Sequence, residues 1–306
     1  MKELILILLF ILGAVFGSFA CCQAWRLRYK AKGKKDLGER SVCLHCGYQL
    51  RWFDNIPIIS WLLLRGKCRK CHKKIGAAEI LAEVGLGTAF FMIGQSYLIP
   101  LVYYWDVLKT NPLVLVLKTA VFIIILVMLV LMCILSVYDA KWGELPTRLL
   151  YTIIILGFVV FGLKEVGLIL SGPDFSLTAN ITDGIFGITG SSLFGVSSGG
   201  WSGALWGLVS MVAGATILAG TCFAIYKVSN ERLMGGGDWL FALAIAFALG
   251  DWWLSLWVMF LSNLLGDIIM LPSLIQKGNH VIHFGPFLMI GFVIVLWLGN
   301  CLPALL

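Results

Sequence analysis

Long apolar runs separated by short polar segments dominate the chain. They cover residues 4–24, 78–100, 113–138, 148–170, 203–226, 238–250, 252–272 and 284–302. A helix needs about 20 apolar residues to cross the hydrocarbon core of a bilayer. The pattern therefore predicts an all-α polytopic membrane protein with about eight transmembrane helices, of which the sixth is the shortest.

The composition supports a membrane protein. Hydrophobic residues make up 60% of the 306 positions and charged residues only 13%, whereas a soluble domain carries about 25% charged residues. An ordinary soluble enzyme, a disordered chain and a small disulfide scaffold are thereby excluded. The segment at 171–201 is rich in Gly, Ser and Thr and lacks a hydrophobic period, so we expect an outer loop without chemistry of its own.

Positive charge is concentrated in one loop. Between Arg26 and Lys74 there are 14 Lys and Arg against 3 Asp and Glu, although the whole chain has a net charge of only +7. Short basic loops stay in the cytoplasm. We therefore expect a first transmembrane helix over 1–25, a cytoplasmic loop domain over 26–76 and a helical membrane domain over 77–306.

Four of the nine cysteines form two CxxC pairs within this loop. Cys43 and Cys46 are followed, after 21 intervening residues, by Cys68 and Cys71. Two such pairs can surround a tetrahedral Zn²⁺ with four thiolates. A closed site of this kind has a structural role, because it folds a loop that has little core of its own. The alternative is a set of unliganded or redox thiols, and the neighbouring His45 or His72 could replace a cysteine ligand.

Five acidic residues lie within or beside the predicted spans. Such residues are costly in lipid and are therefore functional candidates. They are Glu83, Asp139, Asp238, Asp251 and Asp267.

Asp139 and Asp238 are expected at the same, cytoplasmic, membrane boundary. Two adjacent carboxyls can share one proton, so that one acts as general base on a water while the other polarises a scissile carbonyl. Gly235–Gly237 precede Asp238 and would let another chain's backbone approach its carboxylate. Simpler roles are pairing of Asp139 with Lys141 or Arg148 and a helix cap for Asp238. For Asp251 and Asp267 the simpler roles are a turn cap and an interhelical hydrogen bond.

Several motifs resemble those of the bacterial type IV prepilin peptidases, which are GxGD-type aspartic membrane proteases and N-methyltransferases. They are Gly17–Phe19, the four-cysteine loop with Trp52–Pro57, Ser60–Leu62 and Leu64–Arg69, Glu83, Asp139–Pro146, Gly235–Asp238 and Phe284–Leu288. Departures from the family pattern occur at Leu44, Thr147, Leu240 and Ala78–Ile80.

The resemblance implies a membrane-embedded endopeptidase of the bacterial inner membrane. Members of this family remove a short basic leader from type IV prepilins and related pseudopilins at the cytoplasmic face. They then methylate the new amino terminus with S-adenosylmethionine. By carry-over, Asp139 and Asp238 would be catalytic, and Cys43, Cys46, Cys68 and Cys71 would bind structural Zn²⁺.

Other functions remain open from the sequence. The sequence does not identify residues that bind S-adenosylmethionine. Gly235–Gly237 is too short for a nucleotide-binding fingerprint and is not followed by a βα unit. A peptidase without methyl transfer is therefore one alternative. A transporter could use Glu83, Asp238 and Asp267 along a solute pathway. The basic loop could also bind anionic membrane lipid, whereas a nucleic-acid partner is not expected.

Overall fold

The computed structural model of the protein describes residues 2–31, 41–103, 112–171, 200–229, 234–275 and 284–301. Regular structure within these residues is helical, apart from two isolated β-bridges. Most of the predicted outer loop at 171–201 lies outside the described residues.

Eight helical segments correspond to the eight apolar runs. They are α1 (Lys2–Ala31), α3 (Ala77–Ile93) with its continuation through η2 (Gly94–Leu98) and α4 (Ile99–Tyr103), α6 (Pro112–Trp142), α7 (Thr147–Ser171), α10 (Gly200–Ser229), α11 (Asp238–Leu249), α12 (Trp252–Ile275) and α13 (Gly285–Cys301). Six of these segments are long and apolar enough to cross a membrane, whereas α11 and α13 are shorter apolar helices. The predicted all-α polytopic fold is confirmed.

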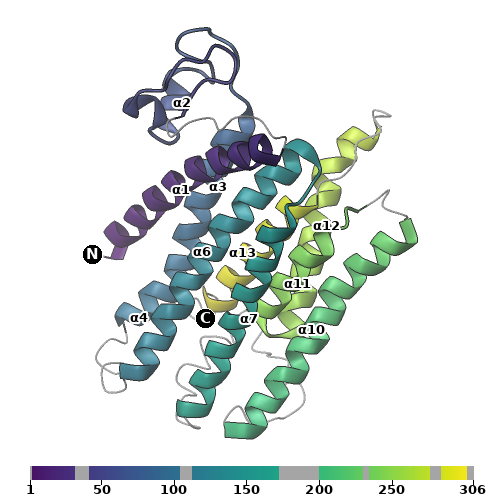
Figure 1. The fold of residues 1–306 in the computed structure, drawn as a ribbon. Helices are drawn as coiled ribbons and strands as arrows, with labels where there is room; N and C mark the ends of the chain where they lie inside the picture. The colour runs from purple at the N-terminus through teal and green to yellow at the C-terminus, as the bar shows by residue number, and fades with distance from the viewer. Residues whose placement is uncertain are drawn as a thin grey trace.

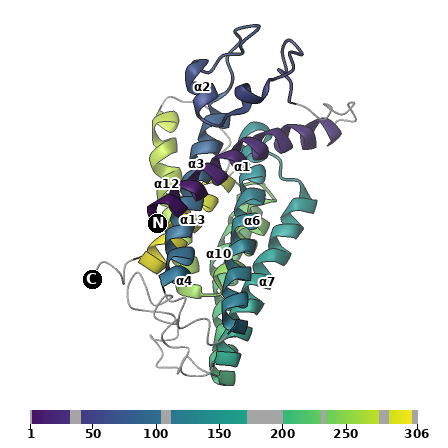
Figure 2. The same cartoon turned by 90° about the vertical axis from the view of Figure 1, so that its left-hand side faces the viewer.

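Helix α6 occupies the centre of the bundle. It contacts α1, α3, α7 and α13, and Figures 1 and 2 show it among these helices. Its apolar sequence is buried more completely than that of the other candidate spans in the described part of the chain. A helix that is apolar all round is stable in such a position because it meets protein on most sides.

The short helix α11 is also enclosed by its neighbours. It contacts α7, α10, α12 and α13, and its alanines at 242, 244, 246 and 248 are buried. A Cβ added at Gly157 of α7 would lie 2.4 Å from the carbonyl oxygen of Ala244. Small side chains therefore allow the two backbones to pack closely.

Glycines also mediate the packing of α1 on α3. A Cβ added at Gly13 would lie 2.6 Å from the Leu86 carbonyl oxygen, and one added at Gly17 would lie 2.5 Å from that of Ala82. This spacing of small residues four apart is typical of close helix pairs in membranes. It gives a physical reason for the glycine of the Gly17–Phe19 motif.

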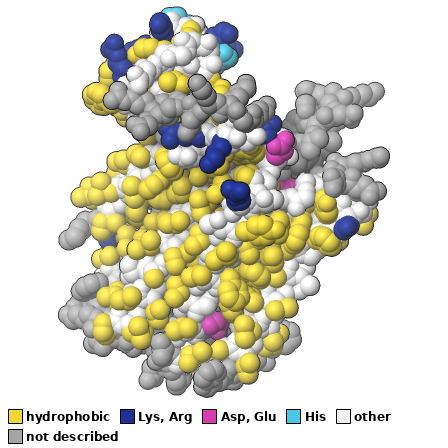
Figure 3. Space-filling view, viewed as in Figure 1, with side chains coloured by type: hydrophobic (Ala, Val, Ile, Leu, Met, Phe, Trp, Pro, Cys, Tyr) yellow, Lys and Arg dark blue, Asp and Glu magenta, His cyan; other side chains and the backbone are white. Residues whose placement is uncertain are grey.

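The outer surface of the helical body is apolar. On α1 the side chains of Leu4, Leu8 and Phe19 are 47–59% exposed. Figure 3 shows hydrophobic side chains covering this face of the body, while Lys and Arg gather above it on the cysteine-containing loop. The surface therefore has the distribution expected of a multi-pass membrane protein.

Candidate active site and metal centre

The four paired cysteines lie together at one end of the bundle. Their sulfur atoms all lie within 4.8 Å of one another, and those of Cys43 and Cys71 are 3.9 Å apart. A tetrahedral site with Zn–S bonds of about 2.3 Å needs sulfur atoms roughly 3.8 Å apart. The cluster thus has the donors and the spacing for Zn²⁺, and it contains neither His45 nor His72.

Both CxxC pairs adopt the same turn. The Cys43 N–H donates to the Tyr48 carbonyl (2.8 Å), and the Cys68 N–H donates to the Lys73 carbonyl (2.9 Å). The residue after each pair has a positive φ, namely Gly47 (68°) and His72 (54°). Such turns aim backbone N–H groups at the sulfur atoms, which stabilises thiolates.

The Cys43 thiol is prepared for metal binding. Burial opposes its ionisation, but hydrogen bonds from the backbone of Cys46 and His45 and from the thiols of Cys68 and Cys46 lower its pKa to about 7. Because Zn²⁺ binds thiolates, this environment favours the ligand form of the side chain near neutral pH.

An ion pair between a buried carboxylate and a half-exposed arginine joins the two halves of the loop. Asp54 lies in the short helix η1 (Trp52–Asn55), and its side chain is 1% exposed. Its carboxylate accepts hydrogen bonds from Arg69 Nε (2.7 Å) and from the Arg51 N–H (3.2 Å). Arg69 also lies over the Phe53 ring. The Trp52–Pro57 motif therefore packs against the second CxxC pair, a contact that the sequence did not reveal.

Glu83 anchors the loop to the membrane helices. Its buried carboxylate on α3 accepts the Ile58 N–H at 2.7 Å, at the start of the short helix α2 (Ile59–Leu63). Ile58 has a φ of 62°, which is costly for a β-branched residue and persists only when its surroundings enforce it. This contact gives Glu83 a structural role.

Asp139 lies near the end of α6, at the same end of the bundle as the loop. It is buried, and α6 continues for one turn beyond it to Trp142. The neighbouring Lys141 pairs with Glu79 of α3 at 2.7 Å. Close by, Arg28 of α1 contacts Glu144 and the Tyr138 hydroxyl. These contacts fix the ends of α1, α3 and α6 around Asp139.

Asp238 begins α11 and is also buried. Its Oδ2 accepts the Gly235 N–H at 3.1 Å, while Oδ1 is buried without a hydrogen-bond partner among the described residues. A Cβ added at Gly237 would lie 2.6 Å from Leu145 Cδ1. The Leu145 side chain, in the turn after α6, therefore packs directly on the Gly237 backbone.

The two carboxyls lie close enough to interact electrostatically. The start of α13 closes the site, because a Cβ added at Gly285 would lie 3.2 Å from Asp139 Oδ2. The Phe284–Leu288 motif thus borders Asp139, a role that the sequence did not indicate. A buried pair of interacting carboxyls can hold one proton between them, which is the arrangement needed for paired acid and base catalysis.

The other two acidic candidates lie apart from this pair. Asp251 Oδ1 accepts the N–H groups of Trp253 (2.7 Å) and Leu254 (3.1 Å), so it caps the start of α12 as one interpretation predicted. Asp267 is exposed on α12.

Comparisons with known proteins point to one group of enzymes. A family model described as "Bacterial Peptidase A24 N-terminal domain" matches residues 11–97, which include the cysteine loop and Glu83. No solved structure matches.

Curated relatives extend the similarity over most of the chain. A prepilin leader peptidase/N-methyltransferase of Pseudomonas aeruginosa is 26% identical, over 94% of this chain and 88% of the relative. Enzymes of the same name from Neisseria gonorrhoeae (28% identical; 83% of this chain and 70% of the relative) and Vibrio cholerae (31%; 52% and 57%) are also similar. The chain is therefore similar to the bacterial prepilin leader peptidase/N-methyltransferases over most of its length, as its motifs predicted.

Proposed function

We propose that the protein removes the leader from type IV prepilins and related pseudopilins, with Asp139 and Asp238 as the catalytic pair. The observation that carries this proposal is the burial of both carboxyls within electrostatic reach of each other, at one end of a bundle of apolar helices. The names of the relatives support the substrate class.

The chemistry proceeds by general acid–base catalysis. The ionised carboxyl takes a proton from a water whose oxygen attacks the scissile carbonyl, while the protonated carboxyl donates its proton to the carbonyl oxygen. Collapse of the tetrahedral intermediate breaks the C–N bond. The leaving amine takes up the proton that the first carboxyl received from the water, and a hydroxyl proton of the intermediate returns to the second carboxyl. The Gly235 N–H holds Asp238 Oδ2, which fixes the orientation of that carboxyl.

The loop of residues 26–76 is assigned to the cytoplasmic side of the inner membrane. Its surplus of Lys and Arg supports this orientation and suits contact with anionic lipid headgroups. Cys43, Cys46, Cys68 and Cys71 would hold structural Zn²⁺, which would stabilise the loop that Glu83 anchors above the carboxyl pair.

Methyl transfer from S-adenosylmethionine to the new amino terminus is proposed from the names of the relatives. An apolar cavity between α10, α12 and α13 does not suit this cofactor. Its polar side chains are those of Thr221 and Asn263, whereas S-adenosylmethionine carries a sulfonium, an amino group, a carboxylate and an adenine. We assign no residues to that step.

The test uses purified protein and a prepilin-like substrate, with and without S-adenosylmethionine. Mass spectrometry reads the cleavage site and the mass of the new terminus together. Asp139→Asn and Asp238→Asn should abolish cleavage. Asp251→Asn is the matched control, because asparagine preserves the helix cap. Normal cleavage by either catalytic variant would refute the assignment, and an unmethylated product from active enzyme would refute methyl transfer.

A further inference from the structure

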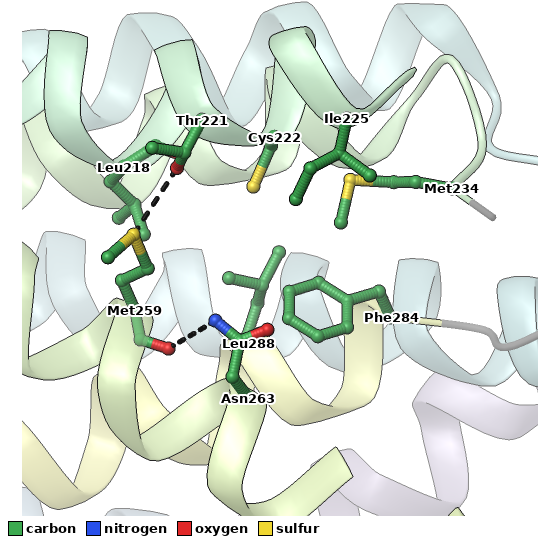
Figure 4. Close-up of a pocket in the computed structure, with 9 residues that line it drawn as sticks. All are labelled: Leu218, Thr221, Cys222, Ile225, Met234, Met259, Asn263, Phe284 and Leu288. Carbon is green, nitrogen blue, oxygen red and sulfur yellow. Dashed lines mark hydrogen bonds between the residues drawn. The ribbon is translucent and has the colours of Figure 1, made fainter. Parts of the chain in front are cut away.

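An apolar cavity of about 250 Å³ lies between α10, α12 and α13. Figure 4 shows Cys222, Met234 and Phe284 directed into it from three different segments. Its remaining walls include Met259, and its polar side chains are Thr221 and Asn263. An apolar lining with a small number of polar side chains is typical of a binding pocket.

Two residues that line the cavity directly precede the glycines beside the two carboxyls. Met234 directly precedes Gly235, whose N–H binds Asp238, and the Cys222 side chain interacts electrostatically with Asp238. Phe284 directly precedes Gly285, the residue that faces Asp139. A peptide bond held between the carboxyls would therefore place a neighbouring side chain at this cavity.

The mouth of the cavity opens on the outer surface of the bundle. Ile225 is 41% exposed, and Asn263 is exposed on α12. The Asn263 amide donates to the Met259 carbonyl at 2.8 Å, and its oxygen is turned toward Phe284 in Figure 4. A polar side chain on a lipid-facing helix is costly, and this one can accept a hydrogen bond from a peptide that enters between α10 and α12.

We propose that this cavity binds the apolar side chain that follows the scissile bond, an inference that rests on the proposed peptidase function. An engineered cavity of about 150 Å³ accepts benzene, so the present one has room for an aromatic or a branched aliphatic side chain. Its sulfur-containing walls can adapt to more than one shape. The cavity thereby selects substrates by the size and apolarity of this side chain.

The first test is a size exchange. Cys222→Phe fills the cavity, and Val212→Phe adds the same bulk at a position of α10 that is 60% exposed and not part of the cavity wall. Each variant is given two substrates that differ only in Phe or Ala after the cleavage site. Cys222→Phe should lower kcat/KM for the Phe substrate at least about tenfold relative to the Ala substrate, whereas Val212→Phe should leave the ratio unchanged.

If a folded Cys222→Phe enzyme cleaves both substrates with an unchanged ratio of kcat/KM values, the proposal is overturned. That result is expected if a lipid chain, and not the substrate side chain, occupies the cavity. Thermal unfolding in detergent confirms that each variant is folded. Failure of the wild-type protein to cleave any substrate would instead refute the peptidase function.

The second test does not need cleavage. A substrate with benzoylphenylalanine after the cleavage site is photolysed with the Asp139→Asn variant, and the crosslinked residue is mapped by mass spectrometry. Crosslinks to Met234 or Met259 support the cavity assignment. Crosslinks confined to residues outside the cavity, or none, would overturn it even if the peptidase is active.

Discussion

Replacement of Gly285 by alanine should lower catalysis without lowering stability. The added Cβ would lie 3.2 Å from Asp139 Oδ2 and 3.8 Å from its Cγ. The distance to Oδ2 is a few tenths of an ångström shorter than an ordinary contact, so the Asp139 carboxyl must move by about that amount. Misplacement of a catalytic group by about 1 Å costs about 100-fold in rate. We therefore expect kcat to fall about tenfold.

The stability of this variant should change in the opposite direction. Gly285 begins α13, and alanine is favoured over glycine within helices by about 0.5–1 kcal/mol. Gly266→Ala is the control, because its added Cβ would meet the rings of Phe284 and Phe287 at 3.8 Å, an ordinary contact. Leader cleavage is measured by mass spectrometry and stability by thermal unfolding. Wild-type cleavage by Gly285→Ala, or loss of activity together with unfolding, would refute the reasoning.

The remaining predictions concern the loop and its attachment. The Cys43 pKa of about 7 means that protons compete with Zn²⁺ as the pH falls through 7, so zinc release to a chelator should become faster at lower pH. Arg69→Ala should destabilise the loop by about 2 kcal/mol, because the substitution removes the charged hydrogen-bond partner of the buried Asp54 carboxylate. Zinc release should be faster in this variant than in the wild-type protein. It should be slower in the double variant Arg69→Ala, Asp54→Ala than in Arg69→Ala alone, because no unpaired carboxylate is then left buried. Gly17→Leu should lower the unfolding midpoint, because even a Cβ meets the Ala82 carbonyl at 2.5 Å, whereas Gly85→Leu should not, since nothing lies within 4 Å of its added Cβ.

Hydropathy predicted the helices well but not all of their ends. The first apolar run ends near residue 24, whereas α1 continues to Ala31. The extra turns are held by tertiary contacts, because Trp25 packs on the Trp142 ring and Arg28 lies over the same ring. Apolar sequence marks the part of a helix that meets lipid or the protein core. It does not mark the end of a helix whose polar side chains contact an adjacent helix.

The site could be predicted only in part, for a similar reason. Local spacing was enough to identify the cysteine cluster, because two CxxC pairs already bring their own ligands together. It could not show that Gly285 faces Asp139 or that Glu83 holds the Ile58 amide, since these pairs are separated by many residues and their contacts depend on helix packing. The cavity was hidden for the same reason, as its walls come from three helices and a turn.

The surroundings of the carboxyl pair are more rigid than the cavity wall. Substitutions at the two places should therefore have different effects on catalysis. Both carboxyls lie beside close-packed backbone, because Asp139 faces Gly285 and Asp238 follows Gly237, on which the Leu145 side chain packs. The cavity wall instead contains flexible sulfur side chains, which repack readily. Changes at the two glycines should therefore lower kcat for all substrates by a similar factor. Changes in the cavity should alter the ranking of substrates while the best substrate is still cleaved, and a glycine variant that reorders substrates would contradict this division.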